Sequence, residues 1–127
     1  MKQNDPVETV EQFISYINAG RVEDVLSFYE ETATFVAEPG VVVSGKQAIG
    51  EAFSQLVAMN PTLTSTAHEI IQSEDIALYC TQWEMTFIDP DGKSMTQKGV
   101  SSDVLRRQGD GRWLIAIDNP FGPEIIK

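Results

Sequence analysis

Apolar residues near the N-terminus recur at helical spacing. Asp5, Pro6 and Glu8 supply an N-cap, a first-turn proline and a capping-box partner, so a helix is predicted to begin there. The Asn-Ala-Gly segment at 18–20 is typical of a helix end. Three- and four-residue spacing places one buried stripe between these limits, made of Val7, Val10, Ile14 and Ile17.

Two more helices and two short strands are expected next. Residues 21–29 have the spacing of a short helix whose stripe includes Tyr29. Segments 32–37 and 41–45 read as strands, and Ser44 is expected to cap a third helix. The apolar stripe of that helix is Ile49, Ala52, Phe53, Leu56 and Val57.

From Thr62 onward the apolar period changes to two, which predicts strands. The expected strands cover residues 63–73, 75–88, 93–107 and 112–119. Tight turns at Asp-Pro-Asp-Gly and Gly-Asp-Gly join the last three into an antiparallel meander. Three helices followed by such a sheet predict an α+β domain whose helices cover one sheet face.

Strand parity indicates that the other sheet face is also apolar. On strand 75–88 the two faces hold Tyr79, Trp83, Met85 and Phe87, against Ile76, Leu78, Cys80, Gln82 and Glu84. On the last strand, Trp113, Ile115 and Ile117 oppose Leu114, Ala116 and Asp118. Helices cover only one face, so we expect a homodimer joined through the open one.

Composition limits the classes of partner. A chain of 127 residues fits one domain, 1–127, and its net charge of -10 repels nucleic acid and anionic lipid. No segment resembles a signal peptide or a membrane span, so a cytoplasmic location is expected. One histidine and one cysteine, Cys80, without clustered ligand spacing or a phosphate-binding loop, predict no metal and no cofactor.

Three segments carry a family resemblance: residues 17–53, the strand segment 81–87 and residues 103–122. Their order and spacing resemble the nuclear-transport-factor-2-like superfamily, and most closely its SnoaL-like branch, which includes relatives of ketosteroid isomerase. The resemblance implies a cystatin-like roll: a cone-shaped, curved antiparallel sheet packed with three N-terminal helices around a central small-molecule pocket, usually in a dimer. It does not imply one reaction.

The resemblance to ketosteroid isomerase also suggests residue roles. It places the catalytic base near Glu38 and the protonated acid that stabilises an oxyanion at Asp103. The tyrosine that shares the oxyanion falls on Phe13, which has no hydroxyl, and Tyr16 is a candidate replacement. Asp118 is expected to face inward beside Leu114 and Ala116. Two neighbouring carboxyl groups in an apolar cavity shift each other's pKa values apart, so that one can act as an acid and the other as a base.

Each acid also has a plainer interpretation. Glu38 fits a solvated turn before Pro39, and Asp103 fits a strand acid paired with Arg106 or Arg107. Asp118 and Asn119 fit an Asx-type turn that ends the strand. His68 lies on a strand of open parity and is expected at the surface or an interface. The residues expected to line the pocket are Phe13, Tyr16, Tyr79, Trp83, Met85, Phe87, Ser101, Asn119 and Phe121.

Two functions remain open from the sequence. One is cofactor-free acid-base catalysis on a small apolar or carbonyl-bearing molecule, as in an isomerase, cyclase or dehydratase, with Glu38, Asp103 and Asp118 as candidate groups. The other is a non-catalytic ligand-binding or dimerisation module on the same scaffold. A cavity of ~300 Å³ or more that holds at least two of the three carboxylates favours the enzyme.

Overall fold

The computed structural model describes residues 5–126 and has three α-helices and one six-stranded sheet. The helices are α1 (Pro6–Asn18), α2 (Val22–Leu26) and α3 (Lys46–Val57), and a 3₁₀ turn, η1 (Gly122–Ile125), follows the last strand. The strands are β1 (Tyr29–Glu38), β2 (Val41–Ser44), β3 (Thr62–Ser73), β4 (Ile76–Ile88), β5 (Ser94–Arg107) and β6 (Trp113–Asp118). This is the α+β architecture expected from the sequence.

The helix termini agree with the sequence in part. The Asp5 side chain accepts a hydrogen bond from the Glu8 N–H at 2.8 Å, as the capping box predicts. The prediction that Ser44 caps α3 is wrong, because Gly45 is the N-cap and the Ser44 hydroxyl pairs with Thr34 at 3.0 Å instead. The second helix ends at Leu26, so Tyr29 begins a strand rather than continuing a helical stripe.

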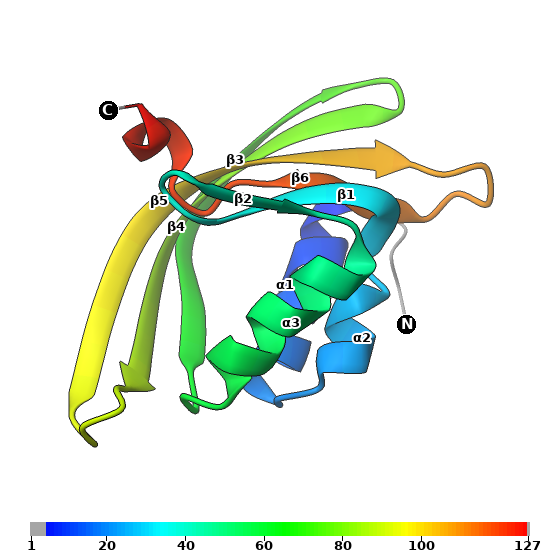
Figure 1. The fold of residues 1–127 in the computed structure, drawn as a ribbon. Helices are drawn as coiled ribbons and strands as arrows, with labels where there is room; N and C mark the ends of the chain where they lie inside the picture. Colours follow the sequence, from blue (N-terminus) through cyan, green and yellow to red (C-terminus); the bar gives the residue numbers. More distant parts are fainter. Residues whose placement is uncertain (1–4, 127) are drawn as a thin grey trace.

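The sheet has the strand order β2-β1-β6-β5-β4-β3. Strands β3 to β6 form the antiparallel meander expected from the turn sequences. The pairing of β1 with β6 is parallel and joins the first and last strands of the chain. Figure 1 shows the sheet curving around the helices, with β4 and β5 bending down beside α1 and α3.

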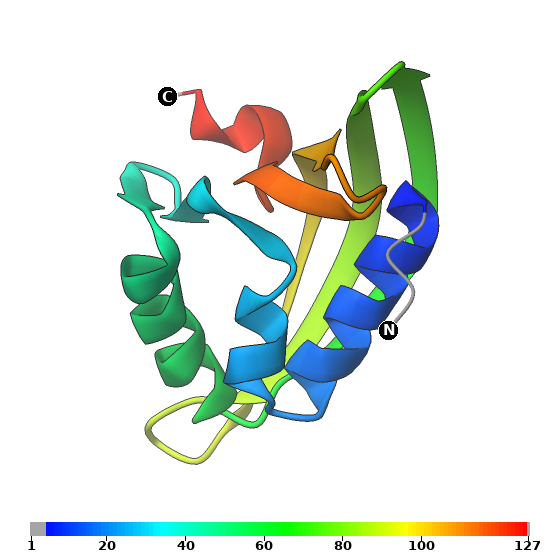
Figure 2. The same ribbon diagram turned by 90° about the vertical axis from the view of Figure 1, so that its right-hand side faces the viewer.

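The core lies between the helices and the concave face of the sheet. Figure 2 shows α1, α2 and α3 together on this side. Phe13 of α1 packs edge-on against Phe28, Tyr29 and Phe53, with ring centroids 5.5 to 6.1 Å apart. None of the helices within residues 5–126 is long and apolar enough to cross a membrane.

The convex face of the sheet carries exposed apolar side chains. Strand register sets Ile71, Leu78, Val104 and Ile117 side by side across β3, β4, β5 and β6. Ile71 is 68% exposed, Leu78 38% and Ile117 44%. We call these four residues the convex row. The prediction that both faces of the sheet are apolar is therefore confirmed.

Candidate functional site

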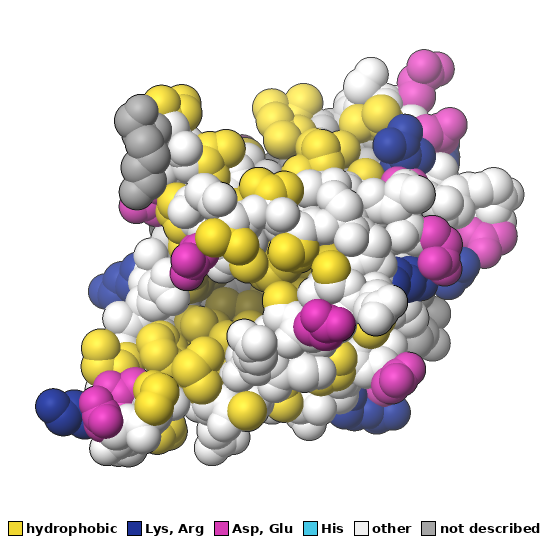
Figure 3. Space-filling model, viewed as in Figure 1, with side chains coloured by type: hydrophobic (Ala, Val, Ile, Leu, Met, Phe, Trp, Pro, Cys, Tyr) yellow, Lys and Arg dark blue, Asp and Glu magenta, His cyan; other side chains and the backbone are white. Residues whose placement is uncertain are grey.

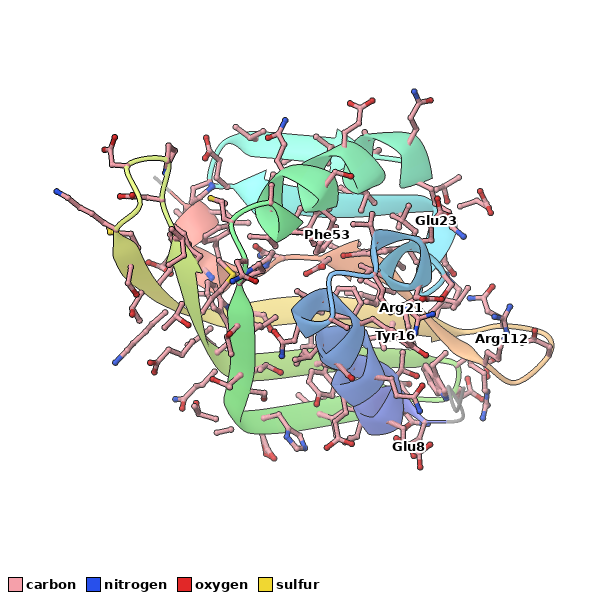
Figure 4. All side chains as sticks on the ribbon, turned by 90° about the horizontal axis from the view of Figure 1, so that it is seen from below. Glu8, Tyr16, Arg21, Glu23, Phe53 and Arg112 are labelled. Carbon is pink, nitrogen blue, oxygen red and sulfur yellow. The ribbon has the colours of Figure 1, made fainter. Side chains whose placement is uncertain are left out.

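A cavity of about 630 Å³ opens between the concave face of the sheet and the helices α1 and α3. Its wall is mostly apolar, and Figure 3 shows a hollow rimmed by hydrophobic side chains. Phe53 of α3 lies between its helix and the sheet, where Figure 4 labels it. The volume falls within the range of small-molecule sites, roughly 300–1,000 Å³.

Two carboxyl groups, Asp103 of β5 and Asp118 of β6, reach this cavity from adjacent strands. Asp118 is 7% exposed, so it is nearly desolvated. Burial has the largest effect on the pKa of each carboxyl; the charge of Asp118 and its hydrogen bond then raise the pKa of Asp103, and the hydrogen bond from Asp103 lowers the pKa of Asp118. The two groups therefore form one acid pair inside an apolar wall.

A β-bulge aims Asp118 into the cavity. Leu105 pairs with Ile115, but the next residue back, Val104, pairs with Ile117, so Ala116 is an extra residue in β6. The insertion reverses the alternation, and Ile115 and Asp118 both face inward while Ile117 is exposed. The sequence-based pairing of Ile115 with Ile117 on one face, and of Asp118 with Leu114 and Ala116 on the other, is therefore wrong.

Tyr29 and Asn119 hold the two carboxyls in place. The Tyr29 hydroxyl donates a hydrogen bond of 2.5 Å to Asp118 Oδ2, and the Asn119 N–H donates one of 2.8 Å to Asp103 Oδ1. Tyr29 is fully buried and does not line the cavity, so it supports Asp118 from behind. Burial and the Asp118 charge raise the pKa of Tyr29 well above its usual range, which keeps the hydroxyl protonated as a donor.

Burial raises the pKa of both carboxyls, but by different amounts. For Asp103 burial and the neighbouring Asp118 raise the pKa well above its usual range, against the opposing contacts of Ser101 and Asn119. For Asp118 burial raises the pKa, while the hydrogen bonds from Tyr29 and Asp103 lower it. The balance favours a protonated Asp103 beside an ionised Asp118, which is an acid next to a base.

Glu38 lies at the edge of the same cavity and is exposed to solvent at the end of β1. The Arg106 guanidinium, a possible partner for Asp103 by sequence, binds Glu30 at 2.9 Å, and Arg107 binds Asp75. The ion-pair interpretation of Asp103 is therefore wrong. The Asx-turn interpretation describes Asn119, whose Oδ1 accepts from the Phe121 N–H at 3.2 Å.

Most of the expected pocket residues line the cavity, and three do not. Those that do are Phe13, Trp83, Met85, Phe87, Ser101 and Phe121. Tyr16 stacks under the Arg21 guanidinium at 5.2 Å, where Figure 4 shows the two labels together, so it cannot replace the hydroxyl missing from Phe13. Tyr79 packs into the core and stacks on His68 at 5.5 Å, and Asn119 is occupied by its turn.

Two residues of the site, Tyr29 and Thr81, are not among those expected from the sequence. Tyr29 falls on a predicted helical stripe, although its position four residues before Ala33 and six before Phe35 fits the inward face of the strand that forms. Thr81 shares the inward face of β4 with Tyr79 and Trp83, so strand parity alone could have identified it. Within residues 5–126 no cluster of three or more metal-ligating side chains is present.

The family model of the SnoaL-like domain matches residues 10–114. No curated protein matches the chain. A nuclear transport factor 2-like superfamily protein from Salmonella enterica is 18% identical, with a TM-score of 0.81 over 91% of this chain and 87% of that one.

Two other solved structures share the fold and carry functional names. A protein from Novosphingobium aromaticivorans, provisionally named a scytalone dehydratase, is 12% identical, with a TM-score of 0.79 over 87% of this chain and 76% of that one. The association domain of C. elegans CaMKII is 20% identical, with a TM-score of 0.69 over 88% of each chain. At these identities the likeness concerns the fold alone.

Proposed function

Because the chain belongs to the SnoaL-like domain family, we propose that it binds a small apolar, carbonyl-bearing molecule in its cavity and catalyses cofactor-free proton transfer on it. The observation that carries the proposal is the buried pair of Asp103 and Asp118 in an apolar cavity. Desolvated carboxyls with separated pKa values are suited to acid-base work near neutral pH. The reaction class is that of an isomerase, cyclase or dehydratase.

In this mechanism Asp118 is the base. Its carboxylate takes a proton from the carbon next to the ligand carbonyl, and Tyr29 holds it in position by the hydrogen bond to Oδ2. Asp103 is the neutral acid, and when the ligand binds its proton turns from Asp118 to the ligand oxygen on which negative charge develops. The proton on Asp118 then returns to the ligand at the same or another carbon, which restores the pair. Glu38, exposed at the cavity edge, is the second candidate base.

The specific ketosteroid isomerase reaction is not what we expect. Phe13 faces the cavity without the hydroxyl that the resemblance would require, and Tyr16 lies outside it. Loss of one oxyanion donor costs ~10²–10³ in rate. We therefore expect little turnover of a β,γ-unsaturated ketosteroid, and a milder carbon acid is the better probe.

Proton exchange on a simple ketone tests the proposal. The methyl protons of 2-acetylnaphthalene exchange with D₂O through an enolate, and NMR follows their loss. We expect the protein to accelerate this exchange, and Asp118→Asn to remove the acceleration by ~10²-fold or more, since a positioned base contributes 10²–10⁴. Asp103→Asn should slow it, and Glu38→Gln measures the contribution of the cavity edge. Glu69→Gln, at an exposed carboxylate on β3, is the matched control.

The second candidate function is a non-catalytic binding or association domain. The structural likeness to an association domain and the exposed convex row support it. We also propose that the chain forms a homodimer through the open sheet face, which either function allows. Binding of 2-acetylnaphthalene without faster proton exchange favours the second candidate, and exchange that depends on Asp118 excludes it.

A further inference from the structure

Two hydroxyl groups in the cavity wall lack hydrogen-bond partners. Thr81 of β4 and Ser101 of β5 face each other in the strand register, and each is 5% exposed. Both side chains line the cavity, yet neither hydroxyl oxygen makes a hydrogen bond within the described residues. Ser101 comes near enough to Asp103 to oppose the rise in pKa that burial causes there. The two hydroxyls therefore adjoin the acid pair.

Unpaired buried hydroxyls require an explanation, because each costs free energy. Most buried polar side chains in proteins have a partner, and loss of that partner costs about 1–3 kcal/mol. The nearby buried polar groups follow the rule, since Asp118 pairs with Tyr29 and Asp103 with Asn119. Valine and alanine would fill the positions of Thr81 and Ser101 without this cost. A ligand that enters the cavity would supply the missing partner.

We propose that Thr81 and Ser101 form an oxygen-binding subsite, in which both hydroxyls donate to the carbonyl oxygen of an uncharged ketone beside Asp103. This inference rests on the proposed ligand-binding function and names its substrate class. Three donors would then converge on one oxygen: Thr81 Oγ1, Ser101 Oγ and the Asp103 carboxyl, whose proton turns from Asp118 to the ligand. They would take the role of the hydroxyl that Phe13 does not provide.

A change of rotamer would bring the hydroxyls to the ligand. Both oxygens are shielded from solvent, although their side chains line the cavity. Moving to another staggered rotamer about the Cα–Cβ bond changes the position of the oxygen. Neither oxygen has a partner with hydrogen-bond geometry, so the rotation sacrifices only the weaker contacts of Thr81 with Tyr79 and of Ser101 with Asp103.

The charges of the cavity select an uncharged ligand over an anion. The acidic side chains that line it are Glu38, Asp103 and Asp118, and no lysine or arginine in residues 5–126 does so. A carboxylate ligand would have to lose its hydration beside like charges with no cation to receive it, which is costly. The subsite therefore accepts a ketone and rejects the matching carboxylic acid in its ionised form.

Three naphthalene probes separate these contributions: 2-acetylnaphthalene, 2-ethylnaphthalene and 2-naphthoate. Titration followed by tryptophan fluorescence gives their affinities. We expect the ketone to bind most tightly and the carboxylate at least about tenfold more weakly than the ketone, since 1.4 kcal/mol is tenfold. Thr81→Val and Ser101→Ala should each weaken ketone binding about 3- to 10-fold, the effect of one hydrogen bond, and leave the hydrocarbon within about twofold.

Neighbouring residues provide matched controls. Thr86→Val on β4 and Ser102→Ala on β5 make the same changes on the other face of each strand and should leave all three affinities unchanged. The infrared C=O stretch of the bound ketone should move to higher frequency in the Thr81→Val/Ser101→Ala double variant as hydrogen bonds to it are lost. Thermal melts of the ligand-free variants should show no loss of stability, because no hydrogen bond is removed.

The possible outcomes separate this inference from the proposed function. Equal ketone affinity in wild type and double variant, or equal loss for ketone and hydrocarbon, would overturn the subsite while leaving cavity binding intact. Failure of wild type to bind either neutral probe would overturn both. Hydroxyl-dependent ketone binding without proton exchange would support the subsite and refute catalysis.

Discussion

Burial of Asp103 makes the stability of the protein depend on pH. The pKa of Asp103 is raised well above the usual range by desolvation and by Asp118, so the folded protein binds this proton more tightly than the unfolded chain does. The free energy of unfolding therefore falls as pH rises from the unfolded pKa, about 3.9, toward the folded one. A neutral side chain of the same shape should remove this decline.

We predict that Asp103→Asn is as stable as wild type near about pH 4 and more stable near about pH 7.5, since its amide does not ionise. The asparagine can still accept from the Asn119 N–H and donate to Asp118. Urea unfolding at both pH values measures the difference. Glu69→Gln, which is exposed, is the control, and a variant that loses stability only at the higher pH would show that Asp103 is held in its ionised form.

Tyr29 affects the protonation of Asp118 from a position outside the cavity lining. Its hydroxyl lowers the pKa of Asp118 against the larger effect of burial. We predict that Tyr29→Phe moves the acidic limb of the proton-exchange pH profile to higher pH and costs about 1.5–3 kcal/mol at neutral pH, as expected for a hydrogen bond to a charged group. Tyr16→Phe, whose ring lies outside the cavity, should do neither. An unshifted profile in Tyr29→Phe would remove Tyr29 from the mechanism.

At the residue scale the sequence could identify the acids but not their partners. Asp103 and Asp118 stand out because the family resemblance points to both. Tyr29 lies 89 positions from Asp118, and their contact depends on the parallel pairing of β1 with β6. That pairing brings together the two ends of the fold, and no local pattern encodes it.

At the element scale, the bulge in β6 decides what the cavity contains. Strict alternation would turn Asp118 to the opposite face from Ile115, but Ala116 adds one residue and aims both inward. Strand parity predicts the two faces of β4 correctly, because no register shift occurs in its pairing with β5. Strand parity predicts the faces of β6 wrongly, because nothing in the amino-acid composition indicates the inserted residue. Here the irregular position of the strand is also the one beside the acid pair.

The contact between β4 and β5 at Gly99 gives a second element-scale prediction. A Cβ at Gly99 would lie 2.6 Å from Trp83 Cζ2, so the indole packs directly on the bare backbone. Trp83 also donates to the Pro120 carbonyl at 2.7 Å and lines the cavity. The glycine therefore fixes one wall of the site.

We predict that Gly99→Ala displaces the indole, costs about 1–3 kcal/mol of stability as overpacking does, and weakens binding of both neutral naphthalene probes. Denaturant melts and fluorescence titration measure the two effects. Gly109→Ala is the matched control, because nothing lies within 4 Å of its added Cβ. Unchanged affinity in Gly99→Ala would mean that Trp83 does not shape the bound state.

At the scale of the whole molecule, the sheet has one face covered by helices and one face without them. The α+β class and the apolar character of both faces are predictable from the sequence, because alternate residues of each strand point to opposite faces of the sheet. The convex row crosses four adjacent strands, so its side chains form one continuous apolar strip rather than scattered exposed residues. The chain has a net charge of -10, so two copies would repel each other if charged groups lay in the contact. A contact through the apolar strip keeps charged groups outside it.

We predict that the protein sediments at micromolar concentration with twice its chain mass of 14.1 kDa. Leu78→Lys places a charge at the centre of the convex row, where burial against a second copy would desolvate it, and should shift the protein to monomer. Ile88→Lys, an exposed apolar position at the far end of the same strand, should leave the dimer intact. A wild-type protein that stays monomeric at all concentrations would refute the dimer. Dissociation by Ile88→Lys but not by Leu78→Lys would move the contact away from the convex row.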